Sequence, residues 1–365
     1  MSYMKLFFLL LSFLFVFPSV VSAQSTDNFY KAEVIEIKNS GTKDIGEKKN
    51  LFQTVRLKIL DGPQKNSFVE VEHGGMLVIT TDQMVKKGEK IIVTRSEDGS
   101  VRIYDRYRLP NVIFLAFLFL IATIVVAGKK GVGSFIGMII SLVIIMLFIV
   151  PQIIQGSNPL LISIIGSAII MVLTLYIAHG FSQRTTIALT ATTLSLVLTG
   201  VLATLFVSFA KLSGLGTEDS YSLLQGLGPS IQFQGLLLGG IIIGTLGVLD
   251  DTTVTQATTI AELSSANPSY SMKKLIQRGM IIGREHIASL VNTLVLAYAG
   301  AGIGVFIYIS IGLSNNMQPW WVIFNSELLM EEVVRTIAGS LGLIAAVPIT
   351  TILAAFFAKN EIKIH

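Results

Sequence analysis

Long runs of apolar residues limit the possible fold of this chain more than any other feature. Each run is about 17–25 residues long, which is the length a helix needs to cross the roughly 30 Å hydrocarbon core of a bilayer. They cover residues 111–127, 132–153, 160–178, 185–209, 235 to about 254, 287–311 and 337–358. Only 14 % of the residues are charged, whereas soluble proteins carry about 25 %. We therefore predict an α-helical polytopic membrane protein with about seven transmembrane helices.

The N-terminus has the pattern of a secretory signal peptide in residues 1–23. Lys5 supplies the positive charge, residues 6–17 form the apolar region, and Val21-Ser22-Ala23 provides small residues for cleavage before Gln24. An uncleaved first helix is the alternative. In either case the segment that follows is exported.

Residues 24–108 form a polar domain in which short strand-like runs alternate with turns. The runs cover residues 31–37, 51–60, 67–72, 76–80, 90–94 and 101–105. Apolar and polar residues alternate within them, and turn residues lie at 61–63 and 97–99. This pattern predicts a small extracytoplasmic β-barrel or sandwich. No catalytic constellation is visible in it, and His73 is interpreted as a surface residue.

Loop charges predict the orientation of the helices in 109–365, because short cytoplasmic loops are enriched in Lys and Arg. With the β-rich domain outside, most of the basic loop residues fall inside, and only Lys211 and Arg335 fall in short outside loops. The predicted inside residues are Lys129, Lys130, Arg184, Lys273, Lys274, Arg278, Arg284, Lys359 and Lys363. We expect a multi-pass membrane protein with a cytoplasmic C-terminus. The resemblance described below implies that the membrane is the bacterial cytoplasmic membrane.

The fifth apolar run carries two adjacent carboxylates, Asp250 and Asp251. A charged side chain within a membrane is costly, and it usually faces the bundle interior and marks a functional path. On a helix, Asp251 is followed at steps of four, three and four by further polar residues, which are Thr255, Thr258 and Glu262. The alternative is a solvated helix end near the cytoplasmic boundary.

Glycines precede this pair on the same helix, at positions 235, 239, 240, 244 and 247. Small residues at four-residue spacing let another helix approach closely. We therefore predict that Gly235, Gly239, Gly240, Gly244 and Gly247 serve helix packing.

The sixth run begins with a second group of polar residues. Arg284, His286 and Asn292, supported by Ser289, are predicted to meet the Asp pair in a proton or cation relay, because loading one proton changes which helix arrangement is favoured. The alternative interpretation makes Arg284 and His286 boundary residues and Asn292 a contact between helices.

Two predicted outside connections have patterns of their own. Residues 213–234 predict either a mobile lid or an ordinary surface loop. Residues 317–335 predict an amphipathic helix along the interface, anchored by Trp320 and Trp321. In it, Glu327, Glu331 and Glu332 are expected to face water. Pro348 is expected to kink or break the last span.

Several classes of function are excluded by missing motifs. The chain has no cysteine, HExxH, GxSxG or Walker A sequence, so thiol chemistry, a zinc protease of that type, an α/β-hydrolase and ATP hydrolysis are not expected. We predict that the chain is not an enzyme, has no cofactor or metal, and binds no nucleic acid, since a net charge of +4 is explained by cytoplasmic loops.

Two motifs resemble those of the YibE/F family of bacterial multi-spanning membrane proteins. They are GTLGVLDDTTVTQ at 244–256 and GREHIASLVNTLVLAYAG at 283–300, and YDRYR at 104–108 also fits. The resemblance covers nearly all of the mature chain. It implies a YibF-like membrane partner or a homo-oligomer, but no assigned activity.

The segment VLDDTTV at 248–254 is also similar to the NDTVVV segment of SecF-type proteins of the RND permease group. In that group a membrane Asp and an Arg of the following helix belong to a proton-driven cycle. The resemblance implies that Asp251 carries the proton, although strict spacing places Glu285, not Arg284, at the Arg position.

These observations lead to two functional hypotheses. The first is a permease-like protein that couples a proton or cation to transport of an unknown substrate. The second is a non-transporting membrane assembly or envelope-signalling component, which recruits a partner through its extracytoplasmic domain.

Overall fold

The fold was obtained as a computed structural model, which describes residues 28–45, 48–75, 78–96, 99–228, 231–314 and 319–360. The predicted signal peptide lies outside these residues. The chain divides into two compact units, with the boundary between Ala122 and Thr123. Each unit is described by itself.

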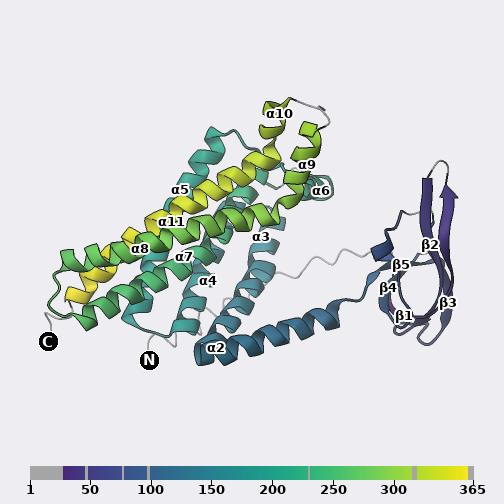
Figure 1. The fold of residues 1–365 in the computed structure, drawn as a ribbon, viewed down its shortest axis with the longest axis horizontal. Helices are drawn as coiled ribbons and strands as arrows, with labels where there is room; N and C mark the ends of the chain where they lie inside the picture. The colour runs from purple at the N-terminus through teal and green to yellow at the C-terminus, as the bar shows by residue number, and fades with distance from the viewer. Residues whose placement is uncertain are drawn as a thin grey trace. The chain divides into compact units, whose positions relative to one another are not determined.

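The first unit contains a five-stranded antiparallel sheet in the order β3-β2-β1-β4-β5 (Figure 1). The strands and one short 3-10 helix are β1 (Asn28–Ile45), β2 (Lys48–Ile59), β3 (Phe68–Gly74), η1 (Thr81–Gln83), β4 (Lys90–Arg95) and β5 (Val101–Arg106). Alternate residues of the strands point to one face and form its core. That core contains Ala32, Val34, Val55, Leu57, Ile59, Val71, Val85, Ile91 and Val93.

The β-rich prediction is confirmed, whereas the strand predicted at 76–80 is wrong for the part that is described. Residues 78–80 are not in a strand. The Thr80 N–H donates to the Gln83 side chain at 2.8 Å and is therefore not available to a neighbouring strand. The strands pair as one sheet, so no second sheet layer of a sandwich is present among the described residues.

The second unit is helical, and the first helices follow the predicted apolar runs closely. They are α2 (Leu109–Ile144), whose residues up to Ala122 belong to the first unit, the π-helical turn η2 (Ile145–Ile149), α3 (Val150–Ile154), α4 (Pro159–His179) and α5 (Gln183–Phe209). Gly128 has φ 59° and ψ −138°, so α2 consists of two helices joined at this glycine. This conformation is open to glycine because it has no side chain.

The remaining helices are α6 (Glu218–Leu227), α7 (Phe233–Ala266), α8 (Met272–Ala301), α9 (Ile303–Ser314), α10 (Trp320–Phe324) and α11 (Glu327–Asn360). In the described part of the chain, seven helical segments are long and apolar enough to cross a membrane. The predicted number of long apolar helices is therefore confirmed.

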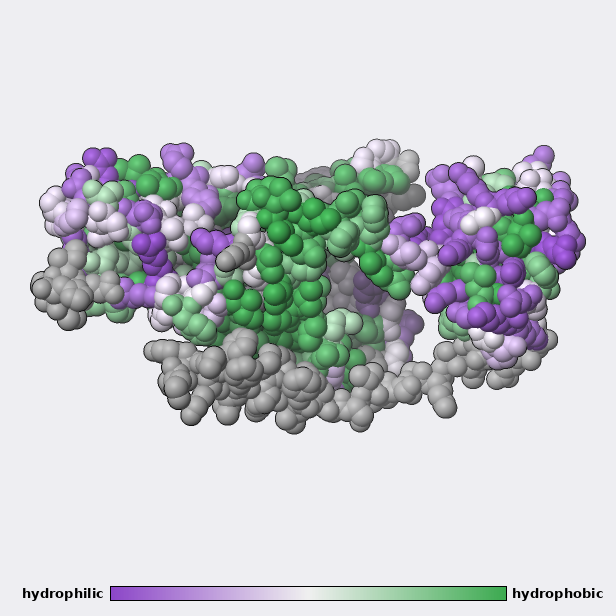
Figure 2. Space-filling view, turned by 90° about the horizontal axis from the view of Figure 1, so that it is seen from below, coloured by the Kyte–Doolittle hydropathy of each residue, from purple (hydrophilic) through white to green (hydrophobic). Residues whose placement is uncertain are grey.

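Helices α5, α7 and α11 lie side by side and contain most of the buried residues of this unit (Figure 1). Figure 2 shows one face of the helical unit, on which hydrophobic residues cover the middle of the helices. The buried residues of α7 contact α4 on one side and α5 and α11 on others. This placement makes α7 the central helix of the unit.

Four predicted boundaries are wrong. The fifth helix ends at Ala266 rather than at about 254. The sixth helix begins at Met272 rather than 287 and ends at Ala301 rather than 311, after which α9 is a separate helix. The last span begins at Glu327, because the segment predicted as one interfacial helix breaks after α10 at Asn325 and Ser326. Its first residues, 317 and 318, lie outside the described residues.

Pro348 does not break the last span, since α11 continues through it. Proline removes one backbone N–H from a helix. The carbonyl left without its helix donor is that of Ile344, four residues earlier. Two neighbouring threonines bind other carbonyls of the same helix, since Thr350 Oγ1 donates to Ala346 O and Thr351 Oγ1 donates to Val347 O, both at 2.7 Å.

Candidate functional site

One face of α7 carries glycines in its first half and polar side chains in its second half. The spacing is four, three, four, four, three and four residues, so all seven positions share a face of the helix. We call this face the α7 stripe, and it consists of Gly240, Gly244, Gly247, Asp251, Thr255, Thr258 and Glu262. Gly240 is partly exposed and the other six residues are exposed.

The glycines of α7 fall into two groups with different surroundings. Gly235 and Gly239 are buried against α4, where an added Cβ would lie 3.1 Å from Pro159 Cδ and 2.3 Å from Ser163 Oγ respectively. These two glycines therefore allow α4 to approach α7 closely.

The stripe glycines do not lie against another helix backbone, although packing was predicted for them. A Cβ at Gly240 would meet only Arg335 Nη1 at 3.1 Å, and a Cβ at Gly244 only Tyr298 OH at 3.4 Å. A Cβ at Gly247 would meet no described atom within 4 Å. The reason for the difference is angular, because Gly239 and Gly240 point about 100° apart on the helix.

The Asp pair lies in the middle of α7, not at a helix end. Asp251 is on the stripe and lies within electrostatic range of His179 on α4 and His286 on α8. Asp250 is half-buried, and its Oδ1 atom is buried without a hydrogen-bond partner in the described chain. Buried polar atoms normally have a partner, so this oxygen marks a place where a proton or ligand can bind.

The structure places His286 within electrostatic range of Asp251, without an ion pair between them, and leaves Arg284 and Asn292 apart. Both residues are exposed, and neither forms a hydrogen bond or ion pair within the described ranges. The helix period explains this, because Arg284 is two residues and Asn292 six residues from His286, which turns them by about 200° and 240° respectively. The predicted relay is therefore assembled only in part.

The supporting residues of the predicted stripe have separate partners. Glu262 forms an ion pair with Arg184 of α5 at 2.8 Å. Ser289 is exposed on α8, where its carbonyl accepts a hydrogen bond from Thr293. Thr255 and Thr258 are exposed.

A buried polar seam on the opposite side of α7 was not predicted. Gln256 is 1 % exposed and donates to Thr351 Oγ1 of α11 at 2.8 Å and to Gly279 O of α8 at 3.0 Å. One turn away, the Thr253 and Thr192 hydroxyls lie 2.6 Å apart. Gln256 is the last residue of the motif at 244–256. Its amide side chain inside an apolar helix is the signal that could have indicated this seam.

A second unpredicted arrangement clamps the segment 213–216 to α11. Glu327 accepts hydrogen bonds from Ser213 N, from Ser213 Oγ at 2.7 Å and from Gly214 N at 3.1 Å. Glu331 accepts one from Gly216 N at 2.9 Å and is only 3 % exposed. The prediction that Glu331 faces water is therefore wrong, because backbone donors satisfy its carboxylate inside the protein. We call these contacts the carboxylate clamp.

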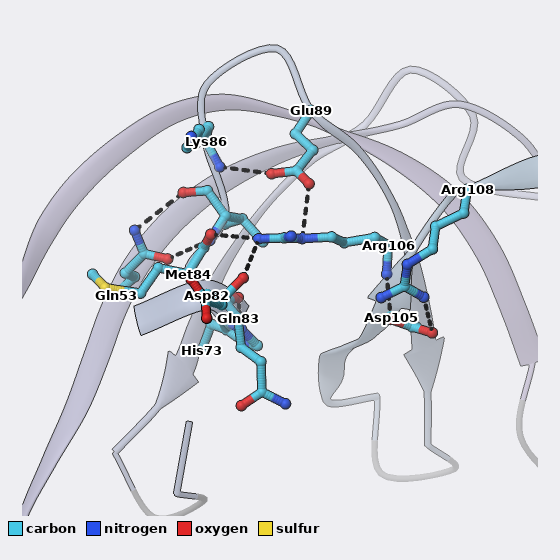
Figure 3. A network of polar contacts seen from close by, with 11 residues as sticks. Gln53, His73, Asp82, Gln83, Met84, Lys86, Glu89, Asp105, Arg106 and Arg108 are labelled. Atoms are coloured by element: carbon cyan, nitrogen blue, oxygen red, sulfur yellow. Dashed lines mark hydrogen bonds and ion pairs between the residues drawn. The ribbon is translucent and has the colours of Figure 1, made fainter. Parts of the chain in front are cut away.

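In the first unit, a polar network surrounds Arg106 (Figure 3). Its Nη2 atom donates to Asp82 O at 2.7 Å and to Met84 O at 2.8 Å, and Nε pairs with Glu89 at 2.9 Å. His73 Nε2 lies 3.1 Å from Gln83 O. The arginine joins backbone carbonyls to a carboxylate and leaves no reactive group free, so we interpret the network as structural.

Comparison with known proteins shows to which protein family the chain belongs. A family model described as YibE/F-like protein matches residues 115–360. The chain belongs to the YibE/F-like protein family. No curated protein and no solved structure matches it. The family match contains the α7 stripe, the polar seam and the carboxylate clamp, and it begins after the β-sheet. Together with the seven long apolar helices, this membership indicates a membrane protein.

Proposed function

We propose that this YibE/F-like protein is a multi-pass protein of the bacterial cell membrane that couples movement of a proton or cation to transport of a substrate. The seven apolar helices and the excess of basic residues in alternate loops support insertion with the β-sheet outside and the C-terminus inside. The predicted signal peptide agrees with this orientation.

The observation that carries the proposal is the Asp pair on the central helix. Asp250 has a buried carboxylate oxygen without a partner in the described part of the chain, and Asp251 lies beside it on the stripe. Ionisable residues inside a membrane domain mark proton and ion pathways by default. His179 and His286 lie within electrostatic range of Asp251 and supply groups that can exchange protons with it.

The shape of the α7 stripe supports a path for the ion. From Gly240 to Gly247 the helix presents no side chains on this face, so water or an ion can approach its backbone closely. Beyond the glycines, Asp251 is followed by Thr255 and Thr258, whose hydroxyls can accept and donate hydrogen bonds. The distance from Gly240 to Asp251 along the helix axis is about 16 Å at 1.5 Å per residue.

Proton movement can be measured directly in proteoliposomes that contain a trapped pH-sensitive dye. With an imposed membrane potential, the unmodified protein is expected to acidify the lumen faster than empty liposomes do. Asp251→Asn and Asp250→Asn are expected to reduce this flux to the level of empty liposomes, because the amide does not exchange a proton at neutral pH.

The matched control is Asp219→Asn, an exposed carboxylate on α6 away from the stripe, which should leave the flux unchanged. Each variant is also tested with a sodium or potassium gradient and the corresponding dye. Normal flux of every ion in both Asp pair variants would refute the coupling role.

A second candidate function is a non-transporting assembly or envelope-signalling component. The observation that favours it is the exposure of six of the seven stripe residues, because a partner helix can cover such a face. A second copy of this chain or a YibF-like companion is the proposed partner. If Asp251→Asn lowers protein abundance in cells and purified protein moves no ion, this function is favoured over transport.

The proton cycle implied by the resemblance to SecF-type proteins gives the same role to Asp251. The ion-flux measurement on Asp251→Asn tests this proposed proton cycle. No enzymatic activity, cofactor or metal is proposed.

A further inference from the structure

A cavity of about 220 Å³ lies between α8, α9 and α11. Its walls are mostly apolar, and three of the lining residues have polar side chains, Tyr298, Glu332 and Thr336. The Thr336 hydroxyl donates to the backbone carbonyl of Glu332. The apolar lining includes Ala299, Val305 and Phe306. An apolar cavity with a few converging polar groups is the usual form of a small-molecule site.

The carboxylate of Glu332 forms only one long ion-pair contact with its neighbour Arg335. Arg335 Nε lies 3.4 Å from Glu332 Oε1, and this buried nitrogen has no hydrogen-bond partner among the described residues. An ionised carboxylate has room for about four acceptor contacts. Glu332 therefore retains the capacity to accept hydrogen bonds or a positive charge from a bound molecule.

The charge around the cavity favours a cation. The first three turns of α11 carry three carboxylates and one guanidinium, and of these groups only Glu332 lines the cavity. The aromatic residues Tyr298 and Phe306 line the same cavity, and aromatic faces attract organic cations. An anion at this place would instead face the Glu332 carboxylate.

The cavity also adjoins the proposed ion path. Tyr298 lies within electrostatic range of both Glu332 and Arg335. Its hydroxyl approaches Gly244 of the stripe, and Arg335 Nη1 approaches Gly240. A molecule that changes the contacts of Glu332 therefore acts on groups that touch the stripe, about two to three turns from Asp251.

We propose that this cavity binds a small organic cation with an apolar body, with its positive group at Glu332 and its body against Val305 and Phe306. A cavity of roughly 150 Å³ accepts benzene, so the volume here suits a benzene ring with one small charged substituent. That this cation is the transported substrate rests on the proposed function. Binding of the cation in the cavity can be tested without any transport measurement.

Three probes of nearly equal size and different charge provide the test. They are phenyltrimethylammonium, which is cationic, tert-butylbenzene, which is neutral, and benzenesulfonate, which is anionic. Binding to the full chain in lipid nanodiscs is measured by titration calorimetry, with protein-free nanodiscs subtracted. We expect the cation to bind at least about tenfold more tightly than the other two, which corresponds to about 1.4 kcal/mol.

The variant Glu332→Gln is expected to remove this preference, since it removes the charge and keeps the side-chain size. Glu218→Gln, on the exposed surface of α6, is the matched control and should keep the preference. If Glu332→Gln does not fold, Ala299→Phe is used to fill the cavity, and it should abolish cation binding. Equal binding of the three probes, preference for the anion, or full cation binding to the filled variant would overturn the assignment.

The result of the binding experiment can be distinguished from the result of the ion-flux experiment that tests transport. Asp251→Asn is expected to retain the cation preference while losing ion flux. A protein that prefers the cation but moves no ion keeps the binding site and refutes transport. A protein that moves protons but binds the three probes equally refutes the site only.

Discussion

On α7, the neighbouring residues Gly239 and Gly240 face different surroundings. Gly239 lies against Ser163 of α4, whereas Gly240 faces the end of the Arg335 side chain. The sequence pattern predicts helix packing for both of them, since each has another glycine four positions away. What separates them is the direction in which the rest of the bundle lies, which a sequence pattern does not contain.

Alanine substitution should distinguish the two kinds of glycine. In Gly239→Ala the new Cβ would lie 2.3 Å from Ser163 Oγ, so α4 must move away and the thermal midpoint should fall. In Gly247→Ala nothing described lies within 4 Å, and the gain in helix propensity of up to about 1 kcal/mol should leave the midpoint unchanged or raised. Thermal unfolding of both proteins in the same detergent, monitored by tryptophan fluorescence, tests this. Equal midpoints would contradict the assignment of Gly239 to packing.

At the end of the β-sheet, Asp105 and Arg108 give a prediction about pH. Arg108 donates a 2.6 Å hydrogen bond to the Asp105 carboxylate, and with the Arg106 N–H it holds the pKa of Asp105 below its ordinary value. A lowered pKa in the folded state means that the stabilisation is present above the unfolded pKa and is lost as pH falls through the folded pKa. We therefore expect the pair to persist at neutral pH and to be lost only below about pH 4.

The measurement is the carboxyl carbon chemical shift of Asp105, followed by NMR during an acid titration. Arg108→Gln should move the titration midpoint upwards, because the charged donor is gone. Asp61, an exposed carboxylate elsewhere in the sheet unit, provides the reference within the same spectra. An Asp105 midpoint that is the same in both proteins would exclude Arg108 as the cause.

At the scale of elements, the carboxylate clamp joins two segments more than a hundred residues apart in sequence. Glu327 and Glu331 are one turn apart at the start of α11, and their carboxylates accept backbone N–H groups between residues 213 and 216. The acceptors are side chains in the first two turns of α11. The donors are backbone N–H groups of the segment 213–216, not the unpaired N–H groups at the start of α11 itself. The result is that the connection between α5 and α6 is held to α11.

Opening of this clamp should be visible by hydrogen exchange. Glu327→Ala removes the acceptor of Ser213 and Gly214, so amides in 213–216 should exchange faster, while those in the buried middle of α7 should not change. Deuterium uptake in nanodiscs, resolved by peptide, measures this difference. Glu218→Ala is the control, since Glu218 lies in the same connection but its carboxylate forms no clamp contact. Unchanged uptake at 213–216 would show that the clamp does not restrain the segment.

At the scale of the whole molecule, orientation in the membrane is the property that the charge pattern predicts. The absence of cysteine makes it directly measurable, because each introduced cysteine is the only thiol in the chain. Ser40 is exposed in β1, and Ser265 is exposed at the end of α7. These two positions are predicted to lie on opposite sides of the membrane.

We expect Ser40→Cys to react with a membrane-impermeant maleimide in intact spheroplasts and Ser265→Cys to react only after lysis. The reason is that the first turn of α8, which follows Ser265 after a short connection, carries Lys273 and Lys274, which are typical of the cytoplasmic side. Labelling is measured by gel shift, with a lysed sample as the control for reactivity. The reverse pattern would invert the proposed topology and with it the direction of the ion path.

The class of fold and the family could be predicted from the amino-acid sequence. Apolar length is a local property, so seven long apolar helices were predicted, the first four close to their observed limits, and strand alternation gave five of the six predicted strands. The DD-containing and REH-containing motifs were sufficient for the family, which the match over 115–360 confirmed.

Which residues share a site depends on how the helices pack. His286 lies within electrostatic range of Asp251 while Arg284 and Asn292 do not, because the three point in different directions from one helix. Glu331 is buried and Gln256 joins three helices, because their partners come from segments distant in the chain. Helix period and hydropathy describe one segment at a time, whereas the partner of a polar group depends on which segments pack together.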